Sequence, residues 1–187
     1  LTDVIKKVEV QVDYSYNDHI MDNYKMRTPP MMPMAMEVTR RTLNTRAAST
    51  TEWDNFSVIS GVDRQENKHA GNMYMRDANP IPPLDGDLRF ESYGAFSEWT
   101  YRLNPNNKLV AGARFDHVKV GSAENDQERT DTNPSGFIRI ESTLPEHGFK
   151  TYAGIGYVER SPDYWELYST ATDHGNGSTN MMGQSSY

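Results

Sequence analysis

Methionine is concentrated in two short stretches of this chain, and its thioether sulfur is a soft ligand for metal ions. The stretch PPMMPMAMEV, residues 29–38, holds four methionines, and residues 72–75 hold two more. His19 and Met21 form a His-x-Met pair nearer the N-terminus. Thioether and imidazole donors suit Cu(I), whereas hard ions prefer carboxylate oxygen. The alternative is that methionine only fills gaps in a core, so the elements that carry these residues must decide.

A long alternating stretch near the N-terminus predicts a β-strand with one apolar face. Residues 7–17 read KVEVQVDYSYN, so valine and tyrosine share one face and polar residues share the other. Eleven residues are enough for a tilted strand to cross a bilayer. An amphipathic strand of a soluble sandwich is the alternative, although about five or six residues would serve there.

Six further long runs make seven strand candidates, with no convincing helix between them. The expected strands after the first cover residues 36–53, 56–75, 88–103, 108–120, 135–144 and 148–160. Short turns at 53–56, 104–107 and 145–148 alternate with longer links around 22–35, 76–87 and 121–134. This alternation is typical of outer-membrane barrels, which have short periplasmic turns and long extracellular loops. The sequence therefore predicts an all-β, antiparallel transmembrane β-barrel fragment in the Gram-negative outer membrane, with residues 1–187 belonging to that one domain.

Composition and charge exclude several other classes. The net charge of −7 and the lack of a basic cluster argue against a nucleic-acid partner. No run of eighteen apolar residues predicts a membrane helix, no signal peptide is recognisable, and the absence of cysteine removes thiolate metal sites from these residues. No phosphate loop, nucleophile triad or zinc spacing is present, so we expect no catalytic residues, no catalytic cofactor and no enzyme activity. Valine and tyrosine should face the lipid, because lysine there would cost about 2–4 kcal/mol.

The register of the second hairpin can be worked out from its turn. If Asp54-Asn55 is a two-residue turn, the numbers of cross-strand partners sum to 109. Met36 then lies opposite Met73 and Met34 opposite Met75, on the polar, inward face. The first strand delivers His19 and Met21 to the same end of the barrel. These six residues are the predicted metal ligands: Met36, Met75, Met73, Met34, His19 and Met21.

One segment carries a resemblance to a known family. Residues 154–169, GIGYVERSPDYWELYS, resemble the mid-barrel signature of TonB-dependent outer-membrane receptors through Arg160, Pro162, Glu166, Leu167 and Tyr168. The segments DNYKMR (22–27), FSEWTYRLN (96–104) and GARFDH (112–117) also resemble strands of that family. The resemblance implies a barrel of 22 strands with an N-terminal plug and a TonB box, neither of which this sequence contains. The open edges of seven strands also lead us to expect further barrel strands outside this sequence.

The methionine-rich hairpin resembles the copper-receptor branch of that family. In such receptors barrel methionines complete a metal site with plug residues, and the 39-residue separation of Met36 and Met75 fits that arrangement. The resemblance implies copper, as Cu(I), for the transported ligand, with the plug, the TonB complex and outer-membrane lipid as partners. Two alternatives stay open, namely a receptor for an iron siderophore or other chelate, and a β-structured surface binding module with no transport role.

Overall fold

The computed structural model describes residues 3–25, 33–77, 85–122, 127–144 and 148–162. These residues form seven strands. In chain order they are β1 (Ile5–Asp22), β2 (Met34–Glu52), β3 (Phe56–Met75), β4 (Asp85–Asn104), β5 (Asn107–Ser122), β6 (Gln127–Leu144) and β7 (Phe149–Val158). The described part of the chain contains no helix that is long and apolar enough to cross a membrane.

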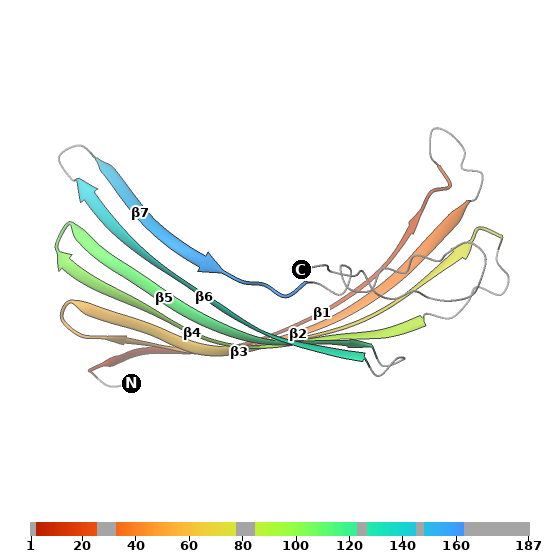
Figure 1. Cartoon of the computed structure of the whole chain (residues 1–187), viewed down its shortest axis with the longest axis horizontal. Helices are drawn as coiled ribbons and strands as arrows, with labels where there is room; N and C mark the ends of the chain where they lie inside the picture. The colour runs from red at the N-terminus through yellow and green to blue at the C-terminus, as the bar shows by residue number, and fades with distance from the viewer. Residues whose placement is uncertain (1–2, 26–32, 78–84, 123–126, 145–147, 163–187) are drawn as a thin grey trace.

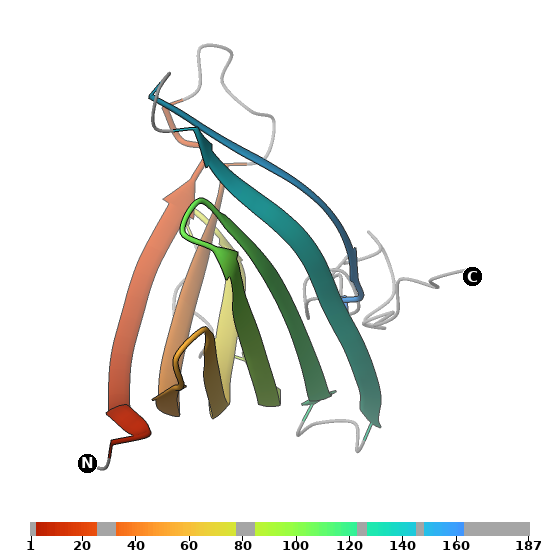
Figure 2. The ribbon, with the colours of Figure 1, turned by 90° about the vertical axis from the view of Figure 1, so that its left-hand side faces the viewer.

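The strands form a single antiparallel sheet in sequence order. Each strand pairs with the next one along the chain, from β1 to β7. The sheet is strongly curved, and the ends joined by the turns β2–β3, β4–β5 and β6–β7 gather on the left in Figure 1, whereas the opposite strand ends gather on the right. Figure 2 shows the strands side by side in an open arch, with β1 and β7 at its two edges. This is the architecture of a barrel wall, and the predicted fold class is confirmed.

The predicted register of the β2–β3 hairpin is confirmed. The Trp53 amide donates to the Phe56 carbonyl at 2.8 Å, which closes a two-residue turn over Asp54 and Asn55. The ladder pairs Thr51 with Val58, Ala47 with Val62, and so on to Met34 with Met75. The rings of Trp53 and Phe56 stack with their centroids 5.7 Å apart, which strengthens the turn.

The sixth strand is longer than predicted. It begins at Gln127 and not at residue 135, so the expected long link over residues 121–134 was wrong. The segment QERTDTNP resembles a loop because both of its faces are polar and it ends in proline. Pro134 is tolerated because β7 pairs with β6 only from Ser135 onward, so Pro134 lies where that ladder has ended.

The two faces of the sheet differ in polarity near the short-turn end. Successive rows across the strands carry apolar side chains on one face, which we call the outer face, and many of these side chains are exposed. The members of this belt include Val8, Val10, Val12, Tyr14, Trp53, Val62, Trp99, Tyr101, Phe115, Ile138, Ile140, Ile155 and Tyr157. A single-layer sheet with an exposed apolar belt fits a hydrocarbon solvent.

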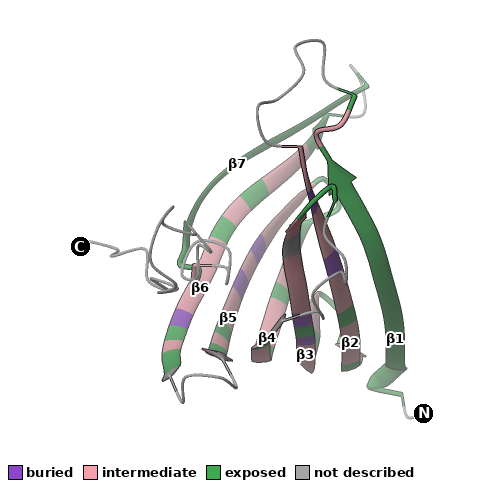
Figure 3. Ribbon diagram, turned by 90° about the vertical axis from the view of Figure 1, so that its right-hand side faces the viewer, coloured by how far each residue is buried: buried purple, intermediate pink, exposed green. Residues whose placement is uncertain are grey.

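The opposite, inner face carries most of the polar residues and most of the buried ones. The alternation of β3 places Asp63, Gln65, Asn67 and His69 there, and Asn67 and His69 are buried. Figure 3 shows that exposed residues cover the edge strands β1 and β7, whereas the buried positions lie on the inner strands. The described residues contain a small hydrophobic core cluster on this face. It consists of Val118 and Val120, with Leu88 and Phe90 packed against them. The polar face therefore corresponds to the lumen of the barrel.

Candidate metal centre

Five methionines meet at one end of the sheet, and we call them the methionine cluster: Met21, Met34, Met36, Met73 and Met75. Met21 of β1 pairs with Met36 of β2, which in turn pairs with Met73 of β3. Met34 pairs with Met75 in the row beyond. Directly opposed residues share a face, with Cβ atoms about 4.5–5.5 Å apart. The cluster therefore occupies two adjacent rows on the lumen face.

Backbone hydrogen bonds continue the ladder past this cluster and fix its outer row. The Asn23 amide donates to the Met34 carbonyl at 3.2 Å, and the Met34 amide donates to the Asn23 side-chain oxygen at 2.9 Å. On the other side, the Arg76 amide donates to the Pro33 carbonyl at 2.9 Å. The guanidinium of Arg76 lies 5.3 Å from the centre of the Tyr24 ring. This cation–π contact links the segments that follow β1 and β3, on either side of β2. Met34 and Met75 are thus held in register at the very end of the hairpin.

Two methionines of the cluster are well exposed, and two others are partly exposed. Met21 is 51% exposed and Met75 is 46% exposed, while Met34 and Met36 are partly buried. Below them the face is closed by Val38, which is 2% exposed and pairs with His19 on one side and Gly71 on the other. A soft ion could approach these sulfur atoms from the lumen.

The structure brings some predicted ligands together more directly than others. Met36 and Met75 are diagonal neighbours, because their direct partners are Met73 and Met34. His19 lies one row nearer the short-turn end than Met21 and is exposed. Met31 and Met32 of the same methionine-rich stretch lie outside the described residues, and nothing is described of the Met73 side chain. Among the described residues, no group of three or more His, Cys, Asp or Glu side chains could hold a metal ion.

A second lumen feature was not predicted from the sequence. Arg114 of β5 donates from Nη1 and Nη2 to the two carboxylate oxygens of Asp63 on β3, at 2.7 and 2.8 Å. It also donates to Asp116 at 2.8 and 2.5 Å. The intervening strand β4 has Gly94 at this point, and a Cβ there would overlap both the guanidinium and the Asp63 carboxylate. Strand parity could have shown that these charges share a face, but not that they meet across a whole strand.

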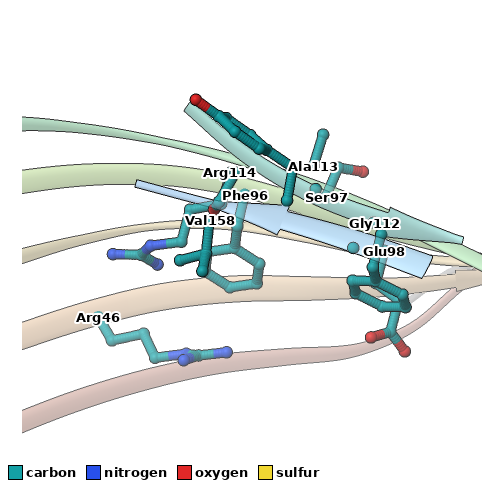
Figure 4. Close-up of a pocket in the computed structure, with 13 residues that line it drawn as sticks. Arg46, Phe96, Ser97, Glu98, Gly112, Ala113, Arg114 and Val158 are labelled. Carbon is teal, nitrogen blue, oxygen red and sulfur yellow. The ribbon is translucent and has the colours of Figure 1, made fainter. Parts of the chain in front are cut away.

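A hollow of about 620 Å³ lies beside this ion pair. Its lining includes Arg46, Phe96, Arg114, Phe137 and Val158. The guanidinium of Arg46 lies 4.4 Å from the centre of the Phe96 ring, and that of Arg114 lies 6.0 Å from it. Figure 4 shows Arg46, Phe96 and Arg114 gathered at this hollow from three different strands. The hollow is lined by aromatic rings and by two guanidinium groups. That of Arg46 contacts Phe96, and that of Arg114 is bound by Asp63 and Asp116.

The outer apolar belt, the polar inner face and the meander topology together define a segment of a transmembrane β-barrel wall. Residues 4–185 match the family described as "TonB dependent receptor-like, beta-barrel". The chain belongs to this family, which places it in the outer membrane of a Gram-negative cell.

A solved structure of the "Copper transporter OprC" is similar to this chain, with 41% sequence identity and a TM-score of 0.79. The match covers 91% of this chain and 30% of that one, so the chain spans less than a third of the length of OprC. No match was found among curated proteins. Arg160 and Pro162 of the family-like motif are described, whereas Glu166, Leu167 and Tyr168 lie outside the described residues.

Proposed function

We propose that this chain is part of the wall of a TonB-dependent receptor that imports copper, and that the ion is captured by lumen-facing methionines. Met36 and Met75 are the principal barrel ligands, and Met73, Met34, Met21 and His19 are the neighbouring soft donors. The observation that carries the proposal is the register that places Met36 opposite Met73 and Met34 opposite Met75 on one face.

The donor set favours a soft, monovalent ion. Thioethers are uncharged and bind Cu(I) better than hard divalent ions. The described residues offer no cluster of His, Cys, Asp or Glu that would suit a harder ion. The name of the similar protein, "Copper transporter OprC", supports the same metal.

The barrel methionines would supply only part of the coordination shell. The family resemblance implies that a plug domain inside the lumen completes the site and that the TonB complex supplies the energy for release. The cluster lies at the end of the wall opposite the short turns, where an ion arriving from outside would first meet it. Capture at this end, followed by movement of the plug, is the simplest transport path.

The test is metal binding by the complete receptor with single substitutions in the cluster. Ag(I), a redox-inert analogue of Cu(I), would be titrated into the wild type and into Met36→Leu and Met75→Leu. Leucine keeps the volume of methionine but removes the sulfur. We expect each variant to bind Ag(I) at least about tenfold more weakly, as for the loss of a metal-site contact.

Two further variants make the result specific. Ile20→Leu changes an exposed residue next to Met21 that points to the other face, and it should leave Ag(I) binding unchanged. Met36→Cys restores a sulfur donor and should recover affinity. If Met36→Leu and Met75→Leu both bind Ag(I) like the wild type, the methionine site is wrong.

A second candidate, import of an anionic siderophore or other chelate, is favoured by the hollow at Arg46, Phe96 and Arg114. Chelate receptors would use arginine and aromatic residues over a wide cavity. Arg114, however, is already neutralised by Asp63 and Asp116. Uptake that depends on Arg46 and not on Met36 would support the chelate.

A further inference from the structure

The exposed methionines of the cluster are also open to oxidation. In the part of the chain that the structure describes, every methionine belongs to the methionine cluster. Met75 is 46% exposed and Met21 is 51% exposed. A peroxide converts a thioether to a sulfoxide, and the sulfur atom most open to solvent meets the oxidant first. Met75 and Met21 are therefore the residues at which oxidation of the cluster begins.

Two cross-strand pairs of the cluster each combine an exposed methionine with a less exposed one. Met75 lies opposite Met34, and Met21 lies opposite Met36. Met34 and Met36 are partly buried. The Cβ atoms of such opposed residues are about 4.5–5.5 Å apart, so a sulfoxide on the exposed member lies next to the second thioether. Oxidation of the exposed members thus reduces each pair from two soft donors to one.

The oxidant can use the same approach as the metal ion. A site that captures an ion from the lumen must admit a small solute there, and hydrogen peroxide is small and uncharged. The charges on the wall therefore do not repel it. This chain contains no cysteine, whose thiolate would consume peroxide ahead of methionine. The thioethers are thus the soft nucleophiles that peroxide meets on this wall.

We infer that Met75 and Met21 are sites of reversible oxidation to methionine sulfoxide, and that this modification switches off capture of the soft ion. The inference rests on the proposed function, because the switch acts on the same site. The sulfur gives two electrons to hydrogen peroxide and the O–O bond breaks. One oxygen atom bonds to the sulfur, and the other leaves as water. A sulfoxide offers a hard oxygen in place of a soft sulfur, and a soft ion binds such an oxygen weakly.

The modification changes the donor without unfolding the wall. The sulfoxide oxygen of an exposed side chain stays hydrated, so no polar atom is buried without a partner. The register at Met34 is held by backbone groups and by the Asn23 side chain, which oxidation of sulfur leaves intact. Cu(I) itself reacts with hydrogen peroxide to give Cu(II), hydroxide and a hydroxyl radical. A receptor that loses affinity for Cu(I) in the presence of peroxide limits this reaction.

The test follows oxidation and ion binding in the complete receptor. The receptor would be treated with hydrogen peroxide for increasing times, and peptide mass spectrometry would give the oxidised fraction of each methionine. After removal of the peroxide, Ag(I) affinity would be measured by titration. We expect Met75 and Met21 to be oxidised before Met34 and Met36. Loss of two donors should weaken Ag(I) binding roughly 100-fold, at about tenfold for each donor.

Three controls connect this loss to the two sulfur atoms. Methionine sulfoxide reductases A and B, supplied with dithiothreitol, return the sulfoxides to thioethers and should restore the affinity. The double variant Met21→Leu, Met75→Leu binds Ag(I) more weakly from the start, and the same brief treatment should not weaken it further. Ag(I) bound before the treatment should slow oxidation of both residues, because a coordinated lone pair cannot attack peroxide.

The outcomes separate the switch from the metal site. An untreated receptor that fails to bind Ag(I) would overturn the proposed function, and the switch with it. Binding before treatment that is unchanged after complete oxidation of Met75 and Met21 would overturn the switch alone. An equal loss of affinity in the double variant would assign the effect to other methionines and overturn the inference. Loss of the thermal transition on oxidation would also overturn it, because the receptor would then have unfolded.

Discussion

Arg114 and Asp63 belong to strands that are not neighbours, yet their side chains form two hydrogen bonds of 2.7 and 2.8 Å across β4. The contact is possible because Gly94 has no side chain between them. Each group is partly exposed, so the pair contributes less than a fully buried one. Its geometric effect is to tie β3 to β5 over the intervening strand.

Gly94→Ala should disrupt this tie. The added methyl group would displace the guanidinium or the carboxylate, and we expect a loss of about 1–3 kcal/mol in the free energy of unfolding, as for other overpacked sites. Denaturant unfolding of the complete receptor in micelles measures the change. Gly71→Ala is the matched control, because its methyl group would meet ordinary contacts of 3.4 and 3.7 Å. Equal stability of the two variants would contradict this role for Gly94.

Lysine at position 62 tests the assignment of the outer face. Val62 is 57% exposed within the apolar belt, so Val62→Lys should destabilise the membrane-inserted barrel by about 2–4 kcal/mol. Thr130→Lys, on the same face of β6 but beyond the belt, should cost about 0–1 kcal/mol. Folding into lipid vesicles measures both values, and the reverse order would place the membrane elsewhere.

Asn23→Ala tests how the outer methionine row is held. The variant removes the acceptor of the hydrogen bond from the Met34 amide. Such a bond contributes about 0.5–1.5 kcal/mol, so Ag(I) affinity should fall by about two- to thirteenfold. Asn23→Asp keeps the acceptor oxygen and should restore affinity. A fall in thermal stability without a fall in affinity would mean that Asn23 has only a structural role.

The pH dependence of metal binding distinguishes thioether from imidazole ligation. Thioethers have no proton to gain near neutral pH, whereas a protonated imidazole cannot bind a metal. We expect Ag(I) affinity to change little between pH 7 and pH 5 if the methionines dominate. A steep loss that disappears in His19→Gln would make His19 a principal ligand.

The sequence predicted those relationships that follow from strand parity and turn length. The two-residue turn after Trp53 fixed the partners of Met34 and Met36, because every later pair in an uninterrupted ladder follows from the first. The start of β6 was missed because strands that rise above the bilayer have polar residues on both faces. The Asp63–Arg114 contact was missed because alternation gives the face on which a side chain lies but not whether it can reach across an intervening strand.

The turn at Asp54-Asn55 therefore sets the cross-strand partners of methionines that lie far from it. One additional residue there would reverse the alternation of β3 relative to β2. The side chain of Met75 would then point to the outer face of the wall, although every methionine codon was intact. The length of this short turn therefore decides whether the methionine positions of β2 and β3 share one face of the wall, and a single-codon insertion there would disrupt the proposed metal site more completely than most point substitutions beside it.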